Sequence, residues 1–225
     1  MLHHEISGNG KKPLVLLHGF MENTTIWEEM GAHLSKDFTL IKIDLPGHGK
    51  SKVYQEIHTV ELTAEKVKEV IDALKLEKIN LLGHSLGGYV SLAFAEKFPE
   101  ILESMTLFFS TTVADDDEKK QIRKRSIAVI DENFETFVKT SIPNLFSNNE
   151  KDILEGKIEL AKNIAKSTNK EGVKAAQLGM AERPDRTEIL ENLDAKILII
   201  AGKYDNAVKT ENLLKIIPEK TNIKT

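Results

Sequence analysis

The chain has 225 residues, of which 40% are hydrophobic, which is enough for one good-sized core and typical of a single α/β domain. Its 31 basic and 35 acidic residues give a net charge of -4 and form no long basic block, so nucleic acid is not an expected partner. Because the sequence contains no cysteine, disulfides, thiolate metal sites and a cysteine nucleophile are excluded.

Membrane and secretion signals are missing from the sequence as given. No stretch approaches the roughly 20 apolar residues of a membrane helix. The first residues do not join a charged segment to an apolar one, as secretory signals do. We therefore expect a cytoplasmic protein that does not bind membranes, and the composition leaves its oligomeric state open.

Short runs rich in Val, Ile and Leu alternate with helical patterns along the chain. Runs that are apolar on both faces predict strands buried in a parallel sheet, and they span residues 13–19, 38–45, 78–84, 104–110 and 195–202. Helical spacing between them joins Ile26, Met30 and Leu34, and then Val67, Val70, Ile71 and Leu74. The alternation predicts an α/β fold, a mostly parallel sheet flanked by helices and joined by right-handed crossovers.

One interval, residues 113–193, breaks this alternation. It contains no convincing strand but several helical stripes, interrupted at Pro143 and at residues 147–150. We expect a helical cap inserted into a core formed by residues 1–112 and 194–225. The alternative is two ordinary crossover helices with long connections, which compact domains rarely contain.

The sequence Gly83-His84-Ser85-Leu86-Gly87 matches the Gly-x-Ser-x-Gly nucleophile elbow. A serine on a sharp strand-to-helix turn needs neighbours without side chains if its hydroxyl is to project above the sheet. A predicted strand precedes the motif and a helical run follows it as far as Pro99, as the motif requires. The simpler interpretation is a glycine-rich turn with an idle serine.

A second element, His18-Gly19, ends the first predicted strand. An oxyanion is stabilised by preorganised N–H donors, and two are available in principle: the amide of Leu86 at a helix start and one from the loop after His18. Taken alone, His18 is more typical of a hydrogen-bonded histidine at a strand end than of a catalytic one.

The motifs "LLHGF", "DLPGHGKS", "LLGHSLGG" and "ILIIAGKYD" occur in the order and approximate spacing of the α/β-hydrolase superfamily. The chain resembles the small esterases and C–C hydrolases of that superfamily over nearly its whole length. This resemblance implies Ser85 as the nucleophile, Asp205 as the triad acid, and the amides of Phe20 and Leu86 as the oxyanion hole. On the residues alone, Asp205 is equally an ordinary turn former.

The triad order of the family is Ser, acid, His, yet no histidine follows Asp205. All seven histidines, at positions 3, 4, 18, 33, 48, 58 and 84, precede the serine. His18 is the least unsuitable internal base, whereas His84 diverges from its neighbour at a sharp turn and His48 belongs to a structural loop of the family. The final residues, 221–225, predict the beginning of one more strand, so we expect a longer hydrolase that is truncated or cut at this point.

The resulting hypothesis is a serine hydrolase that cleaves carboxylic esters of small or medium apolar acyl groups through an acyl-enzyme, with no metal and no organic cofactor. A small-molecule ester is the expected partner, in a pocket lined by Met21, Tyr89, Phe108 and Phe109, although such aromatics are often plain core. Two alternatives remain: a C–C bond hydrolase that uses the same serine, and a non-catalytic ligand-binding protein of this fold.

Overall fold

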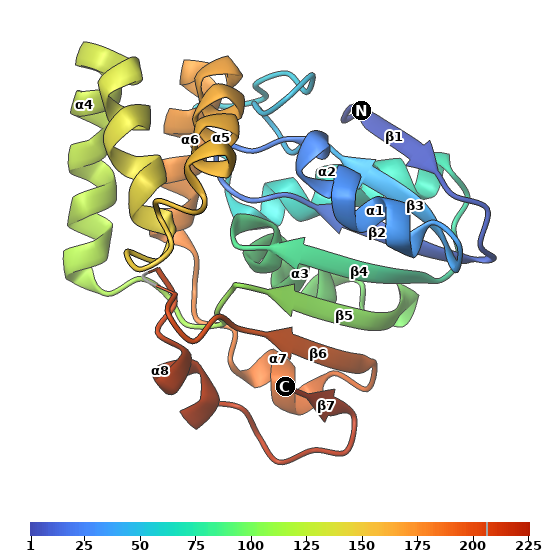
Figure 1. The fold of residues 1–225 in the computed structure, drawn as a ribbon. Coiled ribbons are helices and arrows are strands. Elements are labelled where there is room, and N and C mark those ends of the chain that lie inside the picture. Colours follow the sequence, from blue (N-terminus) through green and yellow to red (C-terminus); the bar gives the residue numbers. More distant parts are fainter. Residues whose placement is uncertain (206) are drawn as a thin grey trace.

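A twisted sheet of seven strands organises the chain (Figure 1). The computed structural model describes residues 1–205 and 207–225. The strand order is β1-β3-β2-β4-β5-β6-β7, and every neighbouring pair is parallel except β1 with β3. The strands are β1 His4–Ser7, β2 Lys12–Leu17, β3 Phe38–Ile43, β4 Ile79–His84, β5 Leu102–Phe108, β6 Lys196–Ile200 and β7 Ile223–Lys224. All five predicted strands and the α/β fold class are confirmed.

Two strands stand outside the five apolar runs. The strand expected to begin near the end of the sequence is β7, which pairs parallel with β6. The antiparallel edge strand β1 is not predicted, because "HEIS" is short, partly charged and only half-buried.

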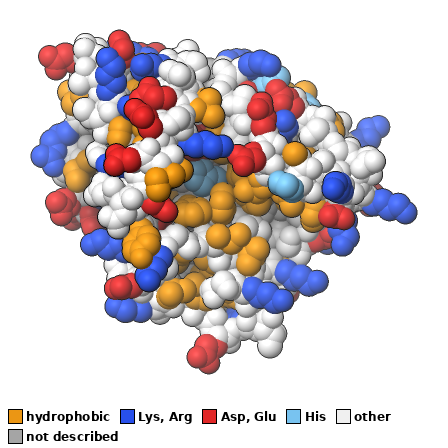
Figure 2. Space-filling view, in the orientation of Figure 1, with side chains coloured by type: hydrophobic (Ala, Val, Ile, Leu, Met, Phe, Trp, Pro, Cys, Tyr) orange, Lys and Arg blue, Asp and Glu red, His pale blue; other side chains and the backbone are white. Residues whose placement is uncertain are grey.

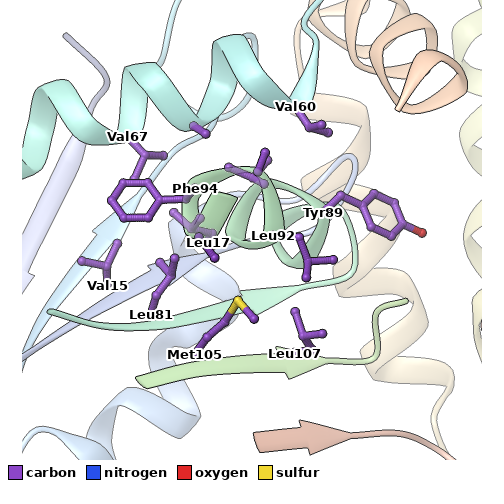
Figure 3. Packing of buried hydrophobic residues seen from close by; sticks show 14 of the residues in the cluster. Val15, Leu17, Val60, Val67, Leu81, Tyr89, Leu92, Phe94, Met105 and Leu107 are labelled. Atoms are coloured by element: carbon purple, nitrogen blue, oxygen red, sulfur yellow. The ribbon is translucent and has the colours of Figure 1, made fainter. Parts of the chain in front are cut away.

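Helices cover both faces of the sheet. On one face lie α2 Val60–Ala73 and α3 Leu86–Lys97, and on the other lies α1 Glu28–Leu34, which follows the 3-10 turn η1 Thr24–Trp27. Alternate residues of β2 serve the two faces: Val15 and Leu17 join the cluster beneath α2 and α3, while Leu14 and Leu16 join Trp27. Figure 3 shows Phe94 of α3 between Val67 of α2 and the strands, at the centre of the larger cluster.

The α1 face is incompletely covered. Along β6 the burial alternates, so that Ile197 and Ile199 face the main core. Leu198 and Ile200 point the other way, and each remains 39% exposed. The outer strands therefore present an apolar stripe on this side.

Helices occupy the interval between β5 and β6, and the described residues 113–193 contain no strand. They are α4 Asp117–Ser141, α5 Glu155–Ser167, α6 Lys170–Glu182 and α7 Glu188–Asn192, with 3-10 turns η2 Pro99–Ile101 before β5 and η3 Ile142–Leu145 after α4; the short α8 Thr210–Lys215 follows β6. Helix α4 bends at Asn133, whose backbone leaves the helical region (φ -154°, ψ 89°). Ile130, Phe137 and Val173 form a small core that also includes Met21 from the loop after β2. The division into a core and a cap domain stays a prediction.

Helix α6 lies against the sheet domain with almost no gap. A Cβ atom on Gly172 would stand 2.2 Å from the carbonyl oxygen of Gly47, and one on Gly179 would stand 1.8 Å from that of His58. The amide of His58 also donates to the carbonyl of Ala175 at 3.0 Å. Backbone-to-backbone contact therefore fixes α6 in place.

No helix in the described part of the chain combines the length and the apolarity that crossing a bilayer requires.

Gly87→Ala tests whether close backbone packing holds the sheet to α3. A Cβ atom at this position would lie 2.2 Å from the carbonyl oxygen of Leu17, so we expect the free energy of unfolding to fall by about 2 kcal/mol or more. Gly156→Ala is the matched control, because no atom lies within 4 Å of the added group and alanine favours the helix by up to about 1 kcal/mol. If urea unfolding gives equal stabilities for the two variants, close packing at Gly87 does not stabilise the fold.

Candidate active site

Ser85 occupies the turn between β4 and α3 with a strained backbone, φ 49° and ψ -109°. Few side-chain-bearing residues adopt this region, and those that do cluster at functional sites. Two contacts hold the turn: the Ser85 amide donates to the Phe108 carbonyl at 3.0 Å, and the Ser110 hydroxyl donates to the Ser85 carbonyl at 2.9 Å. Among the described residues the Ser85 hydroxyl itself makes no hydrogen bond.

The glycines on either side explain how so sharp a turn is accommodated. A Cβ atom on Gly83 would lie 2.2 Å from the Gly87 carbonyl oxygen, and one on Gly87 would lie 2.2 Å from the Leu17 carbonyl oxygen. The first turn of α3 thus sits directly on the ends of β2 and β4. The steric argument for this motif, made from sequence, is matched by these distances.

The loop after β2 runs beside this turn. The Glu22 amide donates to the Gly19 carbonyl at 3.3 Å, and Met21, between them, has φ 58°. Within the described part of the chain, no hydrogen bond involves the amide of Phe20 or that of Leu86. Both amides are therefore free to donate a hydrogen bond to an acceptor from outside the chain.

Backbone strain is concentrated around the Ser85 turn. Among the described residues other than glycine, φ is positive only at Met21, Lys75, Ser85 and Phe109. Met21 lies in the loop after β2, Ser85 follows β4, and Phe109 follows β5, so three of the four meet at the carboxyl ends of adjacent strands. Such strain persists only where the surrounding structure enforces it.

The two buried histidines near the loop, His18 and His48, are neutral and hydrogen-bonded to backbone groups. His18 accepts a hydrogen bond from the Leu45 amide at Nε2 (2.9 Å) and donates from Nδ1 to the Gly19 carbonyl (2.7 Å). His48 bonds through Nδ1 to the Pro46 carbonyl at 3.0 Å. Burial lowers the pKa of His18 and lowers the pKa of His48 to about 3. Within the described structure neither ring makes a hydrogen bond to Ser85.

His84 has a charged partner that the sequence did not reveal. Its Nδ1 lies 2.8 Å from Oε2 of Glu22, and both side chains keep about a quarter of their surface exposed (25% and 26%). Burial alone would lower the pKa of His84, but the Glu22 carboxylate outweighs it, and the pKa is raised. The pKa of Glu22 is lowered, since His84 overcomes the opposing effect of burial. The only sequence signal was an acidic residue four positions after His18.

Asp205 lies in the turn after β6. Its Oδ1 accepts hydrogen bonds from the amides of Ala207 (2.7 Å) and Val208 (2.9 Å), which is the turn-forming use of aspartate. Its charge also contributes to the raised pKa of His84, so the carboxylate faces the same region. The turn role and the expected triad role are compatible, because these contacts use one of the two oxygens.

The four predicted pocket residues lie in three different surroundings. Phe108 and Phe109 contact each other at 4.8 Å between ring centroids and both lie beside His84. Met21 is buried among the small cluster of the α4–α6 region. Tyr89 is buried in the main core, with the Arg183 guanidinium 4.0 Å above its ring.

Hydrophobic side chains gather around a hollow between helices α4–α6 and the carboxyl ends of the strands (Figure 2). A separate depression, lined by residues that include Pro143, Ile158 and Lys162, lies between η3 and α5 and away from Ser85. Among the described residues, no three His, Asp or Glu side chains are grouped so as to hold a metal ion.

Comparison with known proteins adds to this geometry. The family described as alpha/beta hydrolase fold matches residues 12–222. The chain belongs to this family. Among solved structures, an alpha/beta hydrolase neighbour is the thermophilic esterase from Thermogutta terrifontis with malate bound, 32% identical with a TM-score of 0.90, covering 99% of this chain and 82% of that one.

Curated alpha/beta hydrolase relatives match in part or nearly in full. A putative 2-succinyl-6-hydroxy-2,4-cyclohexadiene-1-carboxylate synthase of Bacillus subtilis is 28% identical over 208 residues, 88% of this chain and 75% of the relative. A 2-hydroxy-6-oxononadienedioate/2-hydroxy-6-oxononatrienedioate hydrolase of Escherichia coli is 35% identical over 111 residues, 47% of this chain and 38% of the relative. Three mycobacterial proteins are 34% identical over 111 residues, so the match spans about a third of their length (32%).

The buried neutral His48 predicts a pH-dependent stability. The unfolded chain takes up a proton at this residue near its usual pKa of 6.5, whereas the native state does so only near 3. Stability is therefore lost as the pH falls from about 6.5 toward 3, by up to about 1.4 kcal/mol per pH unit from this residue. We expect His48→Asn, whose amide nitrogen replaces Nδ1, to flatten the dependence measured by urea unfolding between pH 7.5 and 4.5. The control is His33→Asn at an exposed site, and an equal slope in both variants would refute the assignment.

Proposed function

We propose that this alpha/beta hydrolase cleaves carboxylic esters of small or medium apolar acyl groups through an acyl-enzyme on Ser85. The Ser85 oxygen forms a bond to the ester carbonyl carbon, and the amides of Phe20 and Leu86 stabilise the negative oxygen that results. The bond to the alcohol then breaks, and water releases the acid. The observation that carries the proposal is Ser85, its hydroxyl unpartnered, held in a strained turn beside two amides without partners.

The proposed site lacks an identified general base to accept the proton of Ser85. We assign Asp205 the role of orienting a histidine, by analogy with the triad order of the family. No histidine follows His84 in the sequence, and the rings of His18 and His48 are engaged elsewhere. In a serine protease, loss of the triad histidine costs on the order of 10⁶ in turnover. We therefore expect slow turnover from the 225-residue chain alone.

A C–C bond hydrolase that uses the same serine is the second candidate. It is favoured by the two relatives whose names refer to a cyclohexadiene carboxylate synthase and to a dienedioate hydrolase. It predicts cleavage of vinylogous diketones and little activity on simple esters. A non-catalytic binding protein predicts stabilisation by ligand without turnover or covalent labelling.

Ser85→Ala tests the nucleophile. A fluorophosphonate forms a bond between its phosphorus and the Ser85 oxygen, with loss of fluoride and a proton, so we expect the intact mass to increase by one adduct. Hydrolysis of p-nitrophenyl acetate should lose its enzyme-dependent part in the same variant. Ser167→Ala, at an exposed helix end, should keep both properties. Labelling or turnover that survives Ser85→Ala would disprove the role of this serine.

Added imidazole tests the missing base. Imidazole that enters the space beside Ser85 accepts its proton, so we expect ester turnover to rise with imidazole concentration beyond the reaction of imidazole with ester alone. The increase should disappear in Ser85→Ala and weaken in Asp205→Asn, because the carboxylate orients the ring. Steady-state rates at fixed pH give the answer. A rate increase equal in the parent chain and in Ser85→Ala would show that imidazole acts only in solution.

A further inference from the structure

One carboxylate oxygen ties the loop after β2 to the nucleophile turn. Oε2 of Glu22 accepts the Gly19 amide at 2.5 Å and lies 2.8 Å from Nδ1 of His84. Gly19 and Glu22 bracket Phe20, and His84 directly precedes Ser85. The contact therefore joins the two segments that carry the proposed oxyanion donors.

The loop after β2 needs a stabilising contact because its backbone is strained at Met21. Met21 has φ 58° although its side chain is buried, a conformation that costs about 1 kcal/mol or more. The space is also filled: a Cβ atom on Gly19 would lie 2.7 Å from Oε2 of Glu22 and 2.8 Å from Nδ1 of His84. Glycine at position 19 thus lets its backbone approach both partners at once.

Three other segments surround His84, and two of them contribute a carboxylate. Glu22 and the neutral His18 lie in the loop after β2, Asp205 lies in the turn after β6, and the rings of Phe108 and Phe109 at the end of β5 are uncharged. Both carboxylates favour the protonated ring, and burial of the ring opposes it. The raised pKa of His84 and the lowered pKa of Glu22 both favour the charged forms of this pair.

We propose that Glu22 is a positioning residue that holds the Phe20 amide in place beside Ser85, by binding the Gly19 amide and the His84 ring through one oxygen. The inference rests on the proposed serine hydrolase function. Its electrostatic part follows from the location: an unpaired carboxylate two residues after an oxyanion donor would oppose the negative charge that forms there. The raised pKa of His84 favours the protonated ring, which offsets that charge while the 2.8 Å contact holds the carboxylate in place.

Two variants separate the hydrogen bonds from the charge. In Glu22→Gln the amide oxygen still accepts the Gly19 amide and the neutral His84 ring, but the charge is lost. In Glu22→Ala both bonds are lost. Glu28→Gln is the control, because Glu28 is an exposed acid of α1.

Nuclear magnetic resonance detects the contacts of Glu22 with Gly19 and His84 without requiring turnover. We expect the Gly19 amide proton to resonate far downfield in the parent chain and in Glu28→Gln, less so in Glu22→Gln, and at an ordinary position in Glu22→Ala. The pKa of His84 should fall below its usual value in both Glu22 variants, because burial is then less opposed. An unchanged Gly19 resonance in Glu22→Ala, or an unchanged His84 titration in Glu22→Gln, would overturn the proposal.

The affinity for phenylboronic acid measures how the Glu22 variants affect the proposed oxyanion site. The acid forms a bond between boron and the Ser85 oxygen, releases the serine proton to solvent and leaves a negative tetrahedral group against the amides. We expect the dissociation constant at pH 7 to rise about tenfold or more in Glu22→Ala and less than about threefold in Glu22→Gln. Equal affinity in the parent chain and Glu22→Ala overturns the positioning role.

The outcome for Ser85→Ala distinguishes this failure from failure of the proposed function. If the parent chain binds the acid no better than Ser85→Ala, the serine hydrolase function fails, and the positioning role falls with it. If Ser85→Ala abolishes binding while both Glu22 variants bind normally, the function stands and only the role of Glu22 is refuted.

Discussion

The structure depends on the direct contact of helix α3 with the ends of β2 and β4. At Gly87 the helix leaves no room for a side chain against the Leu17 carbonyl, and at Gly83 the strand leaves none against Gly87. Because the strand must reverse into the helix within one residue, Ser85 takes an otherwise costly conformation. Its hydroxyl is left without a partner in the described structure, and the first amide of the helix is left free. The geometry that the proposed attack on a carbonyl requires is thus a result of how closely two backbone segments approach.

Environment, rather than sequence position, decides what each histidine of this site does. His18 and His48 are enclosed, uncharged, and serve as hydrogen-bonding parts of the loops around the strand ends. The pKa of His84 is instead raised, chiefly by the Glu22 carboxylate and in smaller part by Asp205, although this ring too is largely enclosed. Three histidines of one region therefore have different proton affinities because only one of them has a carboxylate in direct contact.

Features that depend on local pattern were predictable, and features that depend on three-dimensional contact were not. The five buried strands, the helical interval and the glycine-serine turn follow from apolar runs, helical spacing and sterics. Strand β1 was not predicted, because an exposed antiparallel edge strand of four residues has no comparable pattern. Glu22 was missed because its partner His84 is 62 residues away and meets it only where β2 and β4 lie side by side. The roles of Ser85, Asp205, Phe20 and Leu86 remain predictions to be tested by the variants described above.

The glycine contacts of α6 set this helix apart from its neighbour α4. Gly172 and Gly179 place this helix in backbone contact with the loops at Gly47 and His58, so it cannot slide or tilt without breaking close packing. Helix α4, by contrast, has a non-helical residue at Asn133 and long exposed stretches between its buried positions. Helix α6 is thus held by backbone contact, whereas the buried residues of α4 are the side chains of Ile130, Phe137 and Val138. A changed side chain on α4 can be accommodated by repacking of its neighbours, but a side chain added at Gly172 or Gly179 must displace backbone.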